Sequence, residues 1–137
     1  MLYNFRVDVF LNPDARLDLE ALGVLSSSGS AWGFLLGHLR GHRFIVEKVY
    51  PSGGAVFPPI EQIMKMDRLW EGRILGFFSF RPDVSFKNAL LGPAFFGKIF
   101  FDVKPSRTGI RIRPFIVEYK NKFHFSPIPL KPGPQGE

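Results

Sequence analysis

The sequence predicts one α+β domain: a curved, mixed sheet of about six strands with two or three short helices. Its 137 residues are enough for a single hydrophobic core but not for two. Hydrophobic residues make up 45% and charged residues 22%, values typical of a soluble globular chain. Stretches with apolar residues at every second position alternate irregularly with stretches of helical spacing. This irregular order argues against the repeated strand–helix units of a doubly wound parallel sheet.

The first fifty residues predict a strand, a helix and a hairpin. Apolar and polar residues alternate over 3–10, which is typical of a half-buried strand. Pro13 follows a turn and begins a helix expected over 13–25. A glycine-bounded apolar run over 31–37 predicts a buried strand, and 43–50 predicts its returning partner, with 38–42 as the turn.

The remaining residues predict two helices and several further strands. Helices are expected over 60–70 and 84–91, the second capped by Asp83. Strands are expected at 73–80, 98–104, 109–119 and 123–125. Four prolines between 127 and 134 predict an extended tail. We therefore expect a domain over 1–125 and a Pro/Gly-rich tail over 126–137.

Composition excludes several classes of protein. With no cysteine, the chain has no disulfide framework, zinc ribbon, iron–sulfur site or thiol nucleophile. No run of about 18 uncharged apolar residues is present, and the first residues reach Asp8 before a signal-peptide core develops. We expect a cytoplasmic protein without membrane contact.

The chain is basic, with 18 Lys and Arg against 12 Asp and Glu, and the excess is greatest after residue 101. Arg111 and Arg113 alternate with isoleucines, which places both on one face of a strand. This balance is compatible with an acidic protein partner or an anionic surface, and a solvated sheet face is the simpler interpretation. Nucleic-acid binding stays open as an alternative, through the basic residues Arg107, Arg111, Arg113, Lys120 and Lys122.

No catalytic motif is complete. His38 and His42 lie four apart, but glycines around them indicate a turn instead of a helix face that would hold a metal. No Gly-x-Ser-x-Gly elbow and no phosphate-binding glycine loop is present. A metal-independent hydrolase that draws its acid and base from scattered residues remains an alternative, with Glu47, Asp83 and His124 as candidates.

Three segments are similar to the JAMM/MPN (JAB-like) family of zinc-dependent deubiquitinating proteases. Residues 32–37 resemble its Gly-x-Leu-x-Gly strand, and 44–51 resemble the next strand, which ends at a proline. Residues 74–82 resemble its Gly-Trp-Tyr-His-Ser-His-Pro segment. The resemblance covers about residues 5–125 and implies an MPN/JAB-like fold, with an architecture like that of cytidine deaminases.

The family's functional residues do not carry over by this resemblance. The catalytic glutamate falls on Ser30, and the two zinc-binding histidines fall on Ser79 and Arg81. The ends of the Ser-x-x-Asp motif fall on Ala89 and Gly92. Arg81 would set a positive charge where a zinc ion should bind. The resemblance thus implies a degenerate member with no catalytic residue, no metal ligand and no cofactor.

We therefore predict a pseudoenzyme: a non-catalytic interaction or scaffold module that binds a protein partner or a second copy of itself. The former active-site surface and the basic strand are the expected contact region. The candidate partner-binding residues are Phe78, Phe80, Arg81, Arg111 and Arg113.

Overall fold

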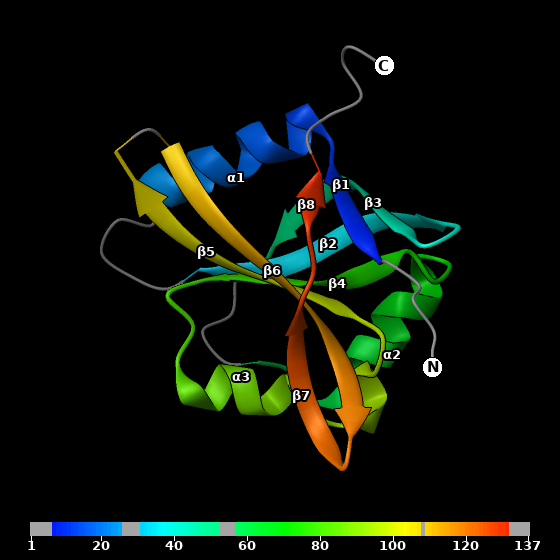
Figure 1. Ribbon diagram of the computed structural model, residues 1–137. Coiled ribbons are helices and arrows are strands. Elements are labelled where there is room, and N and C mark those ends of the chain that lie inside the picture. Colours follow the sequence, from blue (N-terminus) through cyan, green and yellow to red (C-terminus); the bar gives the residue numbers. More distant parts are fainter. Residues whose placement is uncertain (1–6, 26–30, 53–56, 108, 132–137) are drawn as a thin grey trace.

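The computed structural model describes residues 7–25, 31–52, 57–107 and 109–131, which form eight strands and three α-helices (Figure 1). The helices are α1 (Pro13–Leu25), α2 (Ile60–Leu69) and α3 (Val84–Leu90), and a short 3-10 turn spans Pro93–Phe95. The strands are β1 (Asp8–Leu11), β2 (Trp32–Arg40), β3 (Arg43–Pro51), β4 (Ile74–Phe80), β5 (Ile99–Ser106), β6 (Gly109–Lys120), β7 (Lys122–Pro127) and β8 (Leu130–Lys131).

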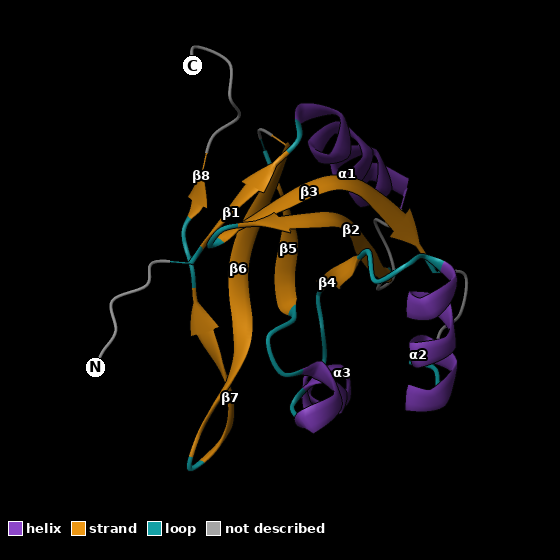
Figure 2. Cartoon of the chain, turned by 90° about the vertical axis from the view of Figure 1, so that its right-hand side faces the viewer, coloured by secondary structure: helices purple, strands orange, loops and turns teal. Residues whose placement is uncertain are grey.

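All eight strands belong to one curved sheet in the order β7-β6-β5-β4-β2-β3-β1-β8 (Figure 2). The β4–β5, β1–β3 and β1–β8 pairs are parallel, and the other pairs are antiparallel. The mixed sheet with few helices confirms the predicted α+β class. At the sheet centre, a Cβ on Gly76 would lie 1.8 Å from the carbonyl oxygen of Ile99, so this close approach of β4 and β5 requires glycine.

The helices divide the sheet into two faces, with α1 on one side and α2 and α3 on the other (Figure 2). We call these the α1 face and the α3 face. The buried core of the α1 face is Val9, Leu11, Ala15, Leu19, Leu35, Phe44, Val46, Val49, Leu75, Phe78, Phe80, Ile99, Phe101, Val103, Ile110 and Ile116. The buried core of the α3 face is Trp32, Phe34, Ile63, Ile74, Phe77, Leu90, Phe95 and Phe100.

Local signals explain where the helices begin. Pro13 starts α1 with a fixed backbone angle, and the Asn12 side chain accepts a hydrogen bond of 2.8 Å from the Asp14 amide. Asp83 caps α3 by accepting a 2.8 Å hydrogen bond from the Phe86 amide. All three predicted helices are confirmed to within one residue at each end.

The predicted turn over 38–42 is too long. β2 continues to Arg40, and a two-residue turn at Gly41 and His42 joins it to β3. Gly41 has a φ of 61°, a conformation that glycine adopts without the cost of a side chain. His38 is therefore a strand residue.

The C-terminal region enters the sheet further than the sequence predicts. β7 continues to Pro127, and β8 pairs with β1 through Leu130 opposite Val9. The predicted boundary at 125 thus lies inside a strand, and the tail over 126–137 contributes residues 126–131 to the folded domain. Its last six residues lie outside the described part of the chain.

Candidate functional site

A cavity of about 570 Å³ lies on the α3 face, where β4 ends and α3 begins. We call it the Ser79 cavity. It is built by the end of β4, the start of β2, the residues that enter α2, and one side of α3. Its lining residues are Trp32, Phe57, Pro58, Pro59, Ile60, Ser79, Arg81, Pro82, Asp83, Ser85, Phe86 and Ala89.

One wall of the cavity consists of three aromatic rings in mutual contact. The ring centroids lie 5.0 Å apart for Trp32 and Phe57, 5.7 Å apart for Trp32 and Phe86, and 5.4 Å apart for Phe57 and Phe86. These tilted and edge-to-face arrangements are the favoured geometries for aromatic pairs. The packing holds each ring in place, so the wall is a rigid apolar surface.

The cavity also has polar and charged lining residues, among them Ser79, the cross-strand partner of Trp32. Ser79 is the second-last residue of β4 and is only 1% exposed. Arg81 is exposed and has a φ of 57°, a left-handed conformation that is uncommon for residues other than glycine. Asp83 directs its carboxylate to the first turn of α3. A charged side chain is thus held at the cavity mouth by an unusual backbone turn, a type of strain that occurs at functional sites.

The sheet register continues this polar region across two more strands. Ser79 on β4 is paired with Asp102 on β5, and Asp102 is paired with Arg113 on β6. Asp102 is 5% exposed, and its Oδ1 atom is buried without a hydrogen-bond partner. The Arg113 guanidinium lies over the ring of Phe115 instead, 5.5 Å from its centroid. An acceptor atom therefore stays unsatisfied beside the cavity floor.

Three of the five degenerate positions meet in this cavity: Ser79, Arg81 and Ala89. Gly92 follows the end of α3 and is not among the lining residues, and Ser30 lies outside the described residues. A hydroxyl, a guanidinium and a methyl group do not suit zinc, which prefers imidazole, thiolate or carboxylate ligands. Within the described ranges, no cluster of three His, Cys, Asp or Glu side chains could hold a metal ion.

The prediction of a partner-binding surface is wrong for two of its five residues. Phe78 is 0% exposed and Phe80 is 1% exposed, and both pack in the core of the α1 face. β4 is buried on both sides along its whole length, so its alternation leaves no aromatic side chain at the surface. Arg81, Arg111 and Arg113 are exposed, as a partner-binding role requires.

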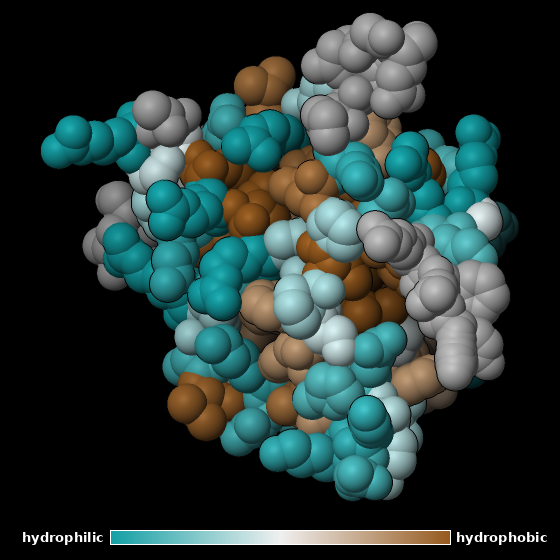
Figure 3. Space-filling view, in the orientation of Figure 1, coloured by the Kyte–Doolittle hydropathy of each residue, from teal (hydrophilic) through white to brown (hydrophobic). Residues whose placement is uncertain are grey.

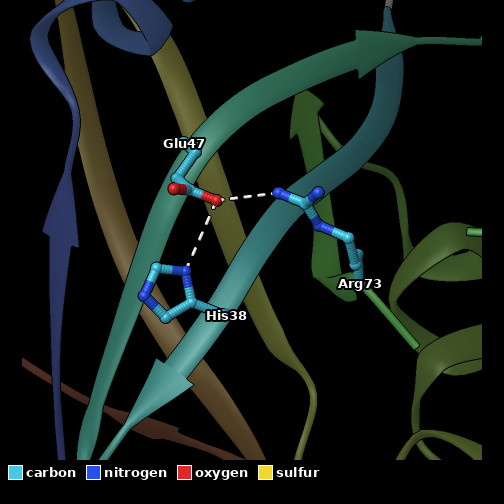
Figure 4. A network of polar contacts seen from close by, with 3 residues as sticks. All are labelled: His38, Glu47 and Arg73. Atoms are coloured by element: carbon cyan, nitrogen blue, oxygen red, sulfur yellow. Dashed lines mark hydrogen bonds and ion pairs between the residues drawn. The ribbon is translucent and has the colours of Figure 1, made fainter. Parts of the chain in front are cut away.

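A second cavity of about 590 Å³ contains a charged network (Figure 4). Glu47 Oε1 accepts a 2.9 Å hydrogen bond from Arg73 and lies 3.4 Å from Nδ1 of His38. A carboxylate beside one imidazole nitrogen is an arrangement that can orient a histidine for acid–base chemistry. No serine, threonine or cysteine is among its described lining residues, so a hydrolysis there would use water as the nucleophile. The sequence did not predict this network because His38 was assigned to a turn.

The three acid–base candidates from the sequence do not converge. Glu47 belongs to the second cavity, Asp83 caps α3, and His124 lies on β7 at the sheet edge. The Ser126 hydroxyl lies 3.1 Å from Nε2 of His124 and donates a 2.6 Å hydrogen bond to Glu118. These three residues form a partly exposed polar contact on the β6–β7 hairpin, and none of them lines either cavity.

The basic candidates fall into two separate groups. Arg111 and Arg113 lie near the start of β6, on the face where Asp102 and Lys104 are their direct partners. Lys120 and Lys122 face each other at the tip of the β6–β7 hairpin. Seven residues of strand separate Arg113 from Lys120, a distance of about 23 Å. The basic residues proposed for nucleic acid therefore do not form one continuous surface.

Comparison with known proteins gives a similar fold but no function. No protein-family model matches the sequence, and no curated protein is similar to it. The structure is similar to the solution structure of protein DSY2949 from Desulfitobacterium hafniense, with a TM-score of 0.64. The match covers 90% of this chain and 93% of that protein at 19% identity. At this identity the likeness concerns the fold alone.

None of the helices in the described ranges is both long enough and apolar enough to cross a membrane.

Proposed function

We propose that this protein is a non-catalytic, MPN/JAB-like interaction module of the cytoplasm, and that the Ser79 cavity binds a segment of a partner protein. One observation carries the proposal. The cavity gathers the positions that the family resemblance assigns to zinc ligands and motif ends, and they are Ser79, Arg81 and Ala89. A cavity at these positions that lacks zinc ligands is suited to binding a segment of a partner protein.

The lining supports a peptide as the ligand. The wall formed by Trp32, Phe57 and Phe86 offers apolar surface to a buried side chain, at about 25 cal/mol for each Å² removed from water. Arg81 adds a positive charge to the cavity lining, which favours a ligand that carries a carboxylate. The volume of about 570 Å³ is in the range of small-ligand sites.

A cavity-filling substitution tests the binding site. Ala89 lines the cavity, and its neighbour Asn88 is an exposed α3 residue outside the lining. We expect Ala89→Phe to weaken a peptide selected from a random library by about tenfold or more, because it occupies the space of the anchor side chain. Asn88→Phe adds the same ring to the same helix and should leave affinity within about twofold. Equal affinities for both variants would contradict the proposal.

Light scattering of the purified protein distinguishes a different partner protein from a second copy of this chain. A monomeric mass means that the occupant of the cavity is another protein. A dimer that dissociates on Ala89→Phe, but not on Asn88→Phe, means that it is a second copy of this chain.

A second candidate function rests on the contact between His38 and Glu47. A carboxylate-bound imidazole in a cavity is the minimal arrangement for general acid–base catalysis with water. Turnover on a panel of activated esters would support it if His38→Ala removes the activity and His42→Ala, a change in the adjacent exposed turn, does not.

A further inference from the structure

Three exposed cations form a strip on the α3 face of the sheet: Lys104 on β5, and Arg111 and Arg113 on β6. We call them the basic strip. Arg111 and Arg113 are two residues apart on one strand, and Lys104 is the direct cross-strand partner of Arg111. In the view of Figure 3, hydrophilic side chains gather at the left, where Figure 1 shows β5 and β6.

The basic strip is adjacent to the Ser79 cavity. Ser79 lines the cavity, its neighbour across β5 is Asp102, and the next residue across β6 is Arg113. Neighbouring strands lie about 4.8 Å apart, so Arg113 begins about 10 Å from the cavity floor. Arg81 at the cavity mouth adds a fourth cation on the same side.

The charges of the basic strip are not balanced within the protein. Among the described residues, Lys104, Arg111 and Arg113 form no ion pair. Like charges directly opposite each other on a sheet destabilise it. Asp102 is the one carboxylate in these rows, and it is only 5% exposed. The isolated protein thus holds a local excess of positive charge that a bound anion would relieve.

We propose that the Ser79 cavity and the basic strip together bind an extended acidic peptide segment. An apolar side chain of the peptide occupies the cavity, and its aspartate or glutamate side chains contact the strip. This inference rests on the proposed function and adds the charge of the ligand. Arg111 and Arg113 are about 7 Å apart along the strand, so carboxylates two residues apart in an extended peptide match them.

The geometry favours a peptide over nucleic acid. Proteins that bind duplex DNA commonly neutralise about six to ten phosphates, whereas the basic strip with Arg81 supplies four cations. Lys120 and Lys122 lie about 23 Å further along β6 and its hairpin and do not extend the strip. An apolar anchor site beside a short row of cations fits a protein segment with one apolar and a few acidic residues.

Asp102 provides a test of the sign of the ligand's charge. Asp102→Asn keeps the shape of the side chain and removes its negative charge. Because the carboxylate repels an acidic ligand, the variant should bind the peptide about twofold to fivefold more tightly. A ligand that donates a positive group to the unpaired Oδ1 atom would instead lose affinity.

The experiment begins with selection of peptides of about twelve residues, which span about 40 Å when extended, from a random displayed library. The bait is the full-length protein, and the selected peptides are then measured by fluorescence anisotropy. We expect enriched sequences with an apolar residue and at least two more acidic than basic residues. Arg111→Gln and Arg113→Gln should each weaken binding about twofold to fivefold. Lys122→Gln removes the same charge at the hairpin tip and should leave affinity unchanged, because salt screens charges beyond about 8 Å.

The outcomes separate this inference from the proposed function. Neutral or basic peptides that depend on the cavity, as judged by Ala89→Phe, would overturn the acidic ligand and leave the proposed function in place. A library that yields no cavity-dependent peptide overturns both. Single-stranded or duplex nucleic acid that binds more tightly than the selected peptides, with loss on Arg111→Gln, would also overturn the inference. Enhanced binding by Asp102→Asn together with loss on Arg113→Gln is the result that supports it.

Discussion

The two faces of the sheet are packed differently, and the candidate site lies on only one of them. The buried core of the α1 face is mostly aliphatic, and the long helix α1 covers it. In the core of the α3 face, five of the eight buried residues are aromatic: Trp32, Phe34, Phe77, Phe95 and Phe100. Two shorter helices cover this face and leave the Ser79 cavity beside the aromatic core.

Strand β4 shows how one element serves both faces. Phe78 and Phe80 fill the α1 face, whereas Phe77 lies in the aromatic core and Ser79 lines the cavity. Where the α1 face has a large ring, the α3 face has a small hydroxyl side chain that leaves space. The α1 face is thus filled by its core, whereas the α3 face holds both a core and the cavity for which we propose binding.

The largest expected effect is on stability and comes from the α1 face. Phe101→Ala removes a ring that is 0% exposed in that core. We expect a loss of about 3–5 kcal/mol in the free energy of unfolding, because a cavity replaces the ring. Chemical denaturation followed by circular dichroism measures it. The variant protein that remains folded should bind the selected peptide normally, and a loss of affinity would contradict the division between the faces.

On the α3 face, Phe86→Ala should reduce peptide affinity more than stability. Phe86 is partly exposed and contributes one ring to the cavity wall. We expect a loss of only about 1–2 kcal/mol in stability, since much of the ring already contacts solvent. Peptide affinity should fall by about tenfold or more, because an aromatic anchor wall is lost. Denaturation and fluorescence anisotropy on one preparation compare the two losses, and a change in stability alone would argue against a binding role.

The smallest expected effect concerns the charged network of the second cavity. Glu47→Gln weakens the contacts to His38 and Arg73, whose side chains are 44% and 56% exposed. Exposed ion pairs contribute about 0–1 kcal/mol, so stability should change by less than about 1 kcal/mol. Thermal and chemical denaturation provide the test. A larger loss, or a loss of peptide binding, would show that the two cavities are coupled.

Elemental analysis of untagged protein independently checks the positions that the resemblance assigns to zinc ligands. We expect less than about 0.1 zinc per chain, because the side chains at those positions are poor zinc ligands. Stoichiometric zinc would refute the alignment to the JAMM/MPN family and redirect attention to His38, His42 and His124.

Local signals predicted most of the fold. The turn before Pro13 and the cap at Asp83 predicted α1 and α3, because these residues act on the backbone beside them. β8 has only two residues, and its pairing with β1 joins positions more than a hundred residues apart, so no local pattern reveals it. Phe78 and Phe80 were wrongly expected at a contact surface, because an apolar run does not reveal that its strand is buried on both sides.

The candidate site was only partly predictable. The family resemblance brought Ser79, Arg81 and Ala89 to attention, and the structure brings them together. The aromatic wall and the unpaired Asp102 depend on contacts between distant segments, which a single sequence does not specify. The network of His38, Glu47 and Arg73 likewise joins β2, β3 and the residue before β4.

The indole N–H signals of the two tryptophans report directly on whether the Ser79 cavity binds a peptide. Trp32 lines the Ser79 cavity, whereas Trp70 lies beyond it, next to Tyr50 at the end of α2. During titration with the selected peptide, we expect the Trp32 signal in the NMR spectrum to shift and the Trp70 signal to stay in place. A shift of Trp70 alone, or of neither indole while the peptide binds, would contradict the assignment of the Ser79 cavity as the binding site.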